Sequence, residues 1–144
     1  MNILVINGPN LNMLGQRENS IYGTKTLDDI NELLKTEAKK NKMKIDFFFS
    51  NIEGEIIDII QKYSGDAIII NAGGYTHYSI AIRDALEIKK IIKVEVHLSN
   101  ILAREEFRQT SVISAVCDGT ITGFGVESYL LALEYIILKT KGKG

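Results

Sequence analysis

Residues 67–77 read AIIINAGGYTH. The apolar run from Ala67 to Ile70 is short, rich in β-branched residues and free of polar side chains, which predicts a strand buried on both faces. Strands of this kind belong to parallel sheets that helices cover on both sides. Asn71 then ends the strand, and the lack of side chains at Gly73 and Gly74 lets the backbone approach a ligand there. A glycine turn followed by a capping threonine is the plainer interpretation of the same residues.

Four further runs have the same character and predict the other strands of the sheet. They are Ile3 to Ile6, Ile45 to Phe49, Ile92 to Val96 and Thr120 to Phe124. Helical periodicity lies between them, over Leu27 to Ala38, Glu53 to Tyr63, Tyr78 to Glu87 and Val126 to Leu138. Leu102 to Val116 is weaker and predicts a short helix and a loop. The alternation indicates an α/β fold, a flavodoxin-like doubly wound five-stranded parallel sheet with helices on both faces.

Two of these helices carry starting signals. Thr26 precedes the first helix and Asp29 follows it by three residues, which is the spacing of a capping box. In the third helix, Thr76 or His77 is expected at the opening position.

Bulk composition sets the class of protein. The 144 residues fit a single domain over 1–144. A formal net charge of −1 gives no general attraction to nucleic acid. Because no apolar stretch approaches the roughly 20 residues of a membrane helix and no basic segment precedes the first apolar run, we expect no membrane association and a cytoplasmic protein. Cys117 is the only cysteine, which excludes an intrachain disulfide.

Polar residues follow three of the predicted strands. NGPNLNMLGQRENSIYG (7–23) comes after the first, NAGGYTH (71–77) after the third and HLSN (97–100) after the fourth. Because ligands of such sheets bind beyond the carboxyl ends of the strands, these segments are expected to form one site.

Glu95 and His97 are the first candidates for chemistry. Residues two apart on a strand share a face, so both side chains point the same way. A carboxylate beside an imidazole fixes its tautomer and raises its pKa, which suits a general acid. A strand-end histidine with a chance neighbour is the alternative.

The segment from Gly8 to Thr24 carries Asn10, Arg17 and Tyr22 and has the glycines of a hinged lid, although a plain surface loop would look similar. A guanidinium beside a phenol favours the phenolate and so makes it a usable base.

Other candidates have ordinary alternatives. The amides of Leu98 and Ser99 follow a strand end, where such groups commonly hold a carboxylate or phosphate. Arg104 and Arg108 share a face if their segment is helical, and either one could simply pair with a nearby glutamate. Asp84 could simply face solvent.

Four segments together resemble the signature segments of type II 3-dehydroquinate dehydratases. They are GPNLNMLGQRENSIYG (8–23), NAGGYTHYSIAIRDA (71–85), EVHLSN (95–100) and AREEFR (103–108). They occur in the order typical of the family, and the resemblance covers essentially the whole chain. Asn19 stands where the family usually has proline, NAGG replaces NPGA, and a histidine pair after the arginine is missing, but none of these differences removes a functional side chain.

The resemblance implies the dehydration of 3-dehydroquinate without cofactor, metal or Schiff-base lysine. Tyr22 would be the base, with Arg17 lowering its pKa and stabilising the enolate. Asn10 would hold the water or the enol oxygen, and His97, oriented by Glu95, would protonate the departing hydroxyl. The substrate would be bound by Asn71, His77, Leu98, Ser99 and Arg108. Asp84 would reach in from a neighbouring subunit of a homododecamer, a tetramer of trimers.

Two other classes of protein compete with this one. A flavodoxin-like binding protein for flavin or nucleotide would need a phosphate-cradling loop after the first strand, against which Pro9 and the crowded asparagines argue. A structural subunit without activity would have lost Tyr22, Arg17 or His97, and all three are present.

Overall fold

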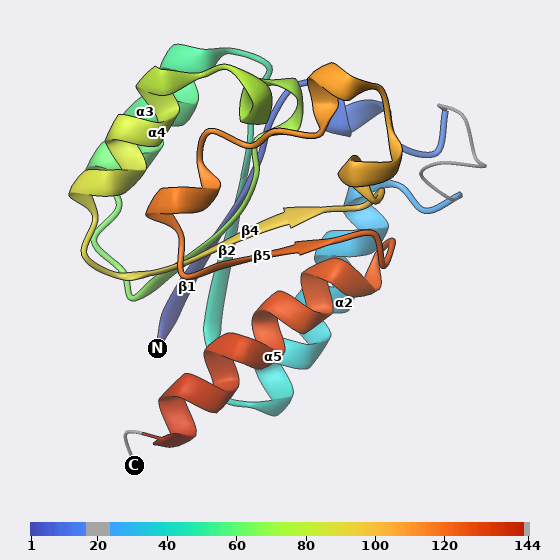
Figure 1. The fold of residues 1–144 in the computed structure, drawn as a ribbon. Helices are drawn as coiled ribbons and strands as arrows, with labels where there is room; N and C mark the ends of the chain where they lie inside the picture. Colours follow the sequence, from blue (N-terminus) through green and yellow to red (C-terminus); the bar gives the residue numbers. More distant parts are fainter. Residues whose placement is uncertain (17–23, 143–144) are drawn as a thin grey trace.

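Five parallel strands form the centre of the fold, and the computed structural model describes residues 1–16 and 24–142 (Figure 1). The strands lie in the order β2-β1-β3-β4-β5, and every pairing is parallel. Their bounds are β1 (Asn2–Asn7), β2 (Lys44–Phe49), β3 (Ala67–Asn71), β4 (Ile92–His97) and β5 (Gly119–Thr122). The α-helices are α2 (Leu27–Lys40), α3 (Glu53–Lys62), α4 (Ile80–Ile88) and α5 (Glu127–Gly142). The strand order reverses between β1 and β3, which makes their carboxyl ends the topological switch point.

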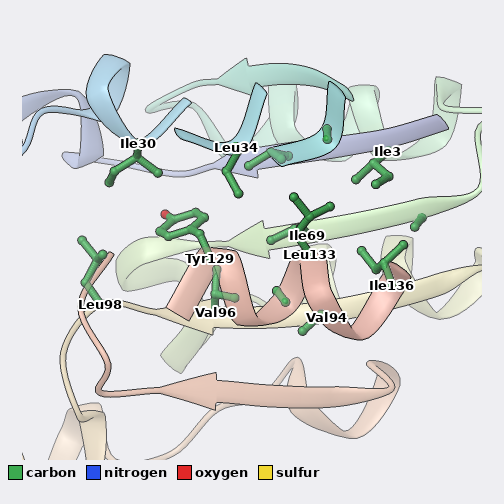
Figure 2. Close-up of a cluster of buried hydrophobic side chains, with 14 of the residues drawn as sticks. Ile3, Ile30, Leu34, Ile69, Val94, Val96, Leu98, Tyr129, Leu133 and Ile136 are labelled. Atoms are coloured by element: carbon green, nitrogen blue, oxygen red, sulfur yellow. The ribbon is translucent and has the colours of Figure 1, made fainter. Parts of the chain in front are cut away.

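The helices cover both faces of the sheet, as the sequence predicts. On one face α2 and α5 pack against alternate residues of the central strands, such as Ile3, Ile69 and Val94 (Figure 2). On the other face α3 and α4 pack against the intervening residues, such as Ile6 and Ile68. Strands β1 and β3 are apolar up to their terminal asparagines because each face of these strands meets a helix.

Helices α2 and α4 each begin after a residue whose side-chain hydroxyl caps the first turn. The Thr26 hydroxyl accepts a hydrogen bond from the Asp29 amide at 3.1 Å, and the Asp29 carboxylate accepts one from the Thr26 amide at 2.9 Å, so the predicted capping box is confirmed. Helix α4 begins differently from the prediction. Its cap is Ser79, whose hydroxyl accepts from the Ile82 amide at 3.0 Å. Residues Gly73–His77 form a 3₁₀ helix before it, so neither Thr76 nor His77 opens the α-helix.

The C-terminal third of the chain differs from expectation in strand β5, in the segment after β4 and in the end of helix α5. Strand β5 ends at Thr122, short of Phe124, because Gly123 turns the backbone at φ +98°. The segment from Leu102 to Val116 forms no α-helix. Instead three short 3₁₀ helices occur, at Ile101–Ala103, Glu106–Arg108 and Ser114–Val116. Helix α5 continues past Leu138 to Gly142. Within the described residues, no helix is both long enough and apolar enough to cross a bilayer.

Candidate functional site

A pocket of about 200 Å³ opens at the switch point, beyond the carboxyl ends of β1, β3 and β4. It is lined by residues from the segments that follow these strands and from the 3₁₀ helices after β4: Pro9, Asn10, Leu11, Asn71, Gly73, Gly74, His77, His97, Leu98, Ser99, Ile101, Arg104 and Arg108. The predicted convergence of three strand ends on one site is therefore confirmed in its geometry. Among the predicted site residues in the described ranges, only Glu95 and Asp84 are outside this lining.

The loop after β1 is fixed by close backbone packing. Gly73 has φ +59°, and a Cβ there would lie 2.9 Å from the Pro9 carbonyl oxygen. Gly8 has even less room, because a Cβ would lie 2.6 Å from the Ala72 carbonyl oxygen. These glycines therefore bring two backbone segments together. Asn10 follows in the left-handed region at φ 71°, and its amide donates to Asn51 Oδ1 at 2.9 Å.

His97 and Glu95 form the pair that the strand spacing predicts. His97 Nε2 lies 2.5 Å from Glu95 Oε2. Glu95 is fully buried and His97 is 6% exposed. An ionised carboxylate only accepts hydrogen bonds, so Nε2 is the ring nitrogen that carries the proton in this contact. Nδ1 is then the nitrogen that remains for a ligand in the pocket.

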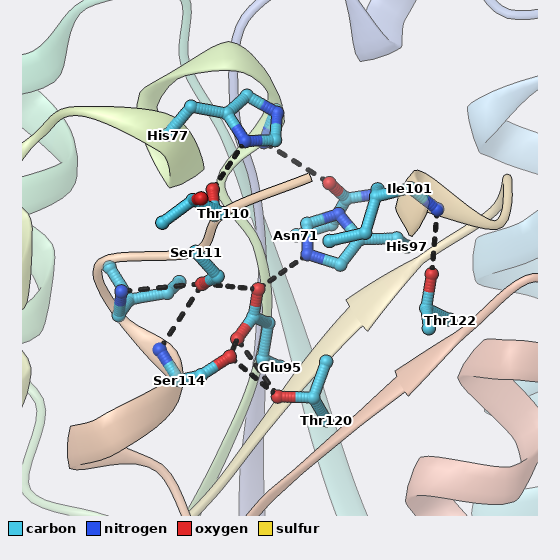
Figure 3. Close-up of polar contacts among 12 residues, drawn as sticks. Asn71, His77, Glu95, His97, Ile101, Thr110, Ser111, Ser114, Thr120 and Thr122 are labelled. Carbon is cyan, nitrogen blue, oxygen red and sulfur yellow. Dashed lines mark hydrogen bonds and ion pairs between the residues drawn. The ribbon is translucent and has the colours of Figure 1, made fainter. Parts of the chain in front are cut away.

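Three hydroxyls complete the surroundings of Glu95 (Figure 3). Ser111 donates to Oε2 at 2.8 Å, and Ser114 and Thr120 donate to Oε1 at 2.5 and 3.0 Å. Burial raises the pKa of Glu95, but the hydrogen bonds from His97 and Ser114, the charge of His97 and the bond from Ser111 outweigh burial and hold this pKa below its ordinary value. The site therefore contains a buried carboxylate that remains an anion beside the imidazole.

The hydroxyls of Ser111, Ser114 and Thr120, called the hydroxyl cage below, lead to a prediction about how stability depends on pH. The pKa of Glu95 is lower in the folded protein than its ordinary value of 4.5, so ionisation of Glu95 stabilises the folded state at any pH above 4.5. This stabilisation is lost as the pH falls below 4.5 and through the lower pKa of the folded state. Ser114→Ala removes one donor and should destabilise the protein by about 1–3 kcal/mol near pH 7. The variant's folded pKa lies closer to 4.5, so its deficit should shrink below pH 4.5, as measured by thermal unfolding from pH 3 to pH 8.

The matched control is Ser128→Ala. Ser128 is buried, and its hydroxyl accepts from the Phe124 amide at 3.1 Å and does not contact a carboxylate among the described residues. The deficit of this variant should not change with pH. A Ser114→Ala deficit that is equally constant would contradict the proposed role of the cage.

The remaining lining residues bring hydrogen-bonding groups and two guanidinium groups to the pocket. His77 Nδ1 donates to the Thr110 carbonyl at 2.8 Å, which leaves Nε2 for other contacts. Arg108 lies on the 3₁₀ helix Glu106–Arg108 and pairs with Glu105 at 3.0 Å. The alternative of a pairing with a nearby glutamate is therefore confirmed for Arg108, and the α-helix that a shared face requires is not formed. Both arginines nevertheless line the pocket. Leu98 and Ser99 follow β4 directly and line it as well.

Besides Glu95, the predicted residue Asp84 does not line this pocket. Asp84 lies on α4, its side chain is 61% exposed, and it pairs with Arg83 at 3.2 Å. Arg17 and Tyr22 lie outside the described residues.

Sequence reasoning missed several members of the site. Ser111 lies in a loop, Ser114 begins a 3₁₀ helix and Thr120 lies on β5, and the sequence carries no spacing signal that links them to Glu95. Across residues 1–16 and 24–142, no group of three or more His, Cys, Asp or Glu side chains could hold a metal ion.

This arrangement can hold a small anionic, hydroxylated molecule and transfer a proton to it. The arginines supply positive charge, the asparagines and Ser99 supply hydrogen bonds, and the His97–Glu95 pair supplies an acid whose partner carboxylate is inaccessible to solvent.

Known proteins have the same sequence pattern and fold. The family model described as Dehydroquinase class II matches residues 1–137. The 3-dehydroquinate dehydratase of Thermotoga neapolitana is 55% identical over 136 residues, covering 94% of each chain. That of Nitratiruptor sp. is 58% identical over 135 residues, covering 92% of this chain and 86% of the relative. The crystal structure of type II dehydroquinase from Butyrivibrio crossotus superposes with a TM-score of 0.92 at 47% identity, covering 94% of this chain and 97% of that one.

Proposed function

The chain belongs to the class II dehydroquinase family and is a hydro-lyase that dehydrates 3-dehydroquinate, and we propose that it does so by dividing two proton transfers between Tyr22 and His97. The observation that carries this assignment of roles is the buried His97–Glu95 pair at the edge of a pocket with two arginines and two asparagines. Elimination of water β to a ketone needs a base, stabilisation of an enolate and an acid.

The base step removes a proton from the carbon next to the ketone. We assign it to Tyr22, with Arg17 favouring the phenolate and balancing the charge of the enolate. Asn10, whose backbone the Asn51 contact fixes, is assigned to the enol oxygen or the released water. The motif GPNLNMLGQRENSIYG supports these three roles.

The acid step expels the hydroxyl. The enolate re-forms the ketone, the new carbon–carbon double bond forms, and the carbon–oxygen bond breaks as His97 gives the leaving oxygen a proton. The product is an enone and the hydroxyl leaves as water. Glu95 stays ionised in its hydroxyl cage and stabilises the imidazolium before the transfer.

Substrate binding is assigned to the rest of the pocket. The residues proposed to hold the carboxylate and hydroxyls are Asn71, His77, Leu98, Ser99 and Arg108. Asp84 is exposed and outside the lining of the pocket in its own chain, which agrees with a contribution to a neighbouring subunit's site in a homododecamer. We further propose that residues 1–144 act as one catalytic domain in the cytoplasm.

The test of this function is an absorbance assay for enone formation from 3-dehydroquinate by the purified chain. Absorbance should grow in proportion to enzyme concentration. No growth above the protein-free blank would overturn the proposal, and a yellow purified protein would favour the flavin-binding alternative instead.

A further prediction is that turnover depends on neither metal nor amine chemistry. The four signature segments contain no lysine that could form a Schiff base and no clustered Cys/His ligand set. Incubation with a chelator should leave the rate unchanged, and so should borohydride added in the presence of substrate. Loss of activity under either treatment would contradict the proposed mechanism.

A further inference from the structure

Behind the pocket, a tyrosine hydroxyl lies between two buried asparagines. Tyr129 lies on α5 inside the apolar core and has no exposed surface (Figure 2). Its hydroxyl oxygen is 2.5 Å from Asn7 Oδ1 and 3.0 Å from Asn71 Nδ2. Asn7 ends β1 and Asn71 ends β3, and the two residues are register partners. The tyrosine therefore contacts both strand ends at the switch point.

The directions of these hydrogen bonds are determined by one backbone group. The Gly73 amide can only donate, and it lies 3.1 Å from Asn71 Oδ1. This contact fixes the Asn71 carboxamide with its oxygen toward Gly73 and its nitrogen toward Tyr129. Because Asn71 Nδ2 donates to the phenol oxygen, the phenol's own proton is directed to Asn7 Oδ1. Donation in this hydrogen-bond network thus runs from Asn71 to Tyr129 and from Tyr129 to Asn7.

The Tyr129 hydroxyl is the donor to Asn7 in this hydrogen-bond network. Burial raises the pKa of Tyr129 well above its ordinary value, and the hydrogen bond from Asn71 offsets only part of that effect. The hydroxyl therefore stays protonated near neutral pH and acts as a donor to Asn7.

We infer that Tyr129 is a positioning residue for substrate binding, which acts through Asn71 by holding its carboxamide in one orientation at the pocket wall. This inference rests on the proposed function. Asn71 is 4% exposed and lines the pocket, and with one N–H engaged by Tyr129 it has its second N–H left for a ligand. The group that Asn71 meets is therefore an acceptor, a hydroxyl or carboxylate oxygen of the substrate. A flipped amide would present its oxygen there and would place two donors against each other at Gly73.

The experiment is a double-mutant cycle on KM for 3-dehydroquinate. Tyr129→Phe should raise KM about five- to tenfold, the effect of losing roughly one oriented hydrogen bond, and should change kcat by less than about twofold. In an Asn71→Ala background the same substitution should leave KM unchanged, because the residue through which it acts is gone. A general loss of stability would not produce this dependence.

Two further variants keep the test decisive. Tyr135→Phe alters a half-buried tyrosine on the same helix and should leave KM at the parent value. Asn7→Ala removes the acceptor of the Tyr129 hydroxyl, so it should raise KM in the parent but not in Asn71→Ala. This variant keeps the inference testable even if Tyr129→Phe fails to fold. An unchanged KM in Tyr129→Phe or Asn7→Ala, or a rise that persists in full without Asn71, would overturn the inference. If the parent forms no enone at all, it is the proposed function that fails.

Discussion

Tyr22→Phe is expected to lower turnover by about 10³-fold or more, within the range that general base catalysis contributes, while substrate binding stays nearly intact. Phenylalanine keeps the ring and removes only the oxygen that takes the proton. The proposed anchors for the substrate lie elsewhere, on Asn71, Ser99 and Arg108, so binding should survive. The measurement is kcat from enone absorbance, with the dissociation constant of the substrate from calorimetry. A Tyr22→Phe enzyme with parental turnover would show that the base lies elsewhere.

Arg17→Ala is the companion variant. An unperturbed phenol has a pKa of about 10, so a tyrosine base near neutral pH needs a cation beside it. Arg17 is the only Lys or Arg between Gly8 and Gly23. The residual activity of Arg17→Ala should therefore rise with pH as the untuned phenol ionises. Arg17→Lys should rescue only partly, because an ammonium lacks the planar fork of donors. If Arg17→Ala loses activity but keeps the parent's pH profile, Arg17 does not tune Tyr22.

His97→Ala is expected to lower kcat by about 10²-fold or more, the usual scale for loss of a general acid. Glu95→Gln should cost less, because the imidazole remains and only its orientation and its neighbouring charge change. The other histidine, His77, is the matched control. Its Nδ1 is held by the Thr110 carbonyl and not by a carboxylate, so His77→Ala should act mainly on KM. A fully active His97→Ala enzyme would remove the acid from the mechanism.

Local patterns were enough to predict the sheet and the contact between Glu95 and His97. The apolar run from Ala67 to Ile70 correctly indicates a strand covered on both sides, because a parallel strand between two helix layers has no polar face. The spacing of Glu95 and His97 was enough to pair them, because the period of a strand is two. The capping box at Thr26 could also be predicted, because its hydrogen bonds join residues only three positions apart.

What the sequence did not reveal depends on long-range contacts. Ser111 and Ser114 reach Glu95 because the segment after β4 folds back over the sheet, and Thr120 reaches it because β5 pairs with β4. No periodicity in the sequence marks these contacts. Tyr129 looks like one more apolar position of α5, and its contact to Asn7 joins residues 122 positions apart. The one short helix expected after Leu102 is divided into separate 3₁₀ helices of three residues each, which the sequence pattern did not resolve.

The central claim is that one elimination is divided between a base in the segment after β1 and an acid on β4. It is tested most directly by deuterium exchange at the carbon next to the ketone, followed by NMR of substrate recovered from deuterated buffer. The account predicts that His97→Ala still exchanges this hydrogen, because the base step is intact, while its enone formation is lost. Tyr22→Phe should show neither. Substrate recovered undeuterated from His97→Ala, or exchanged by Tyr22→Phe above the enzyme-free blank, would contradict this division of roles.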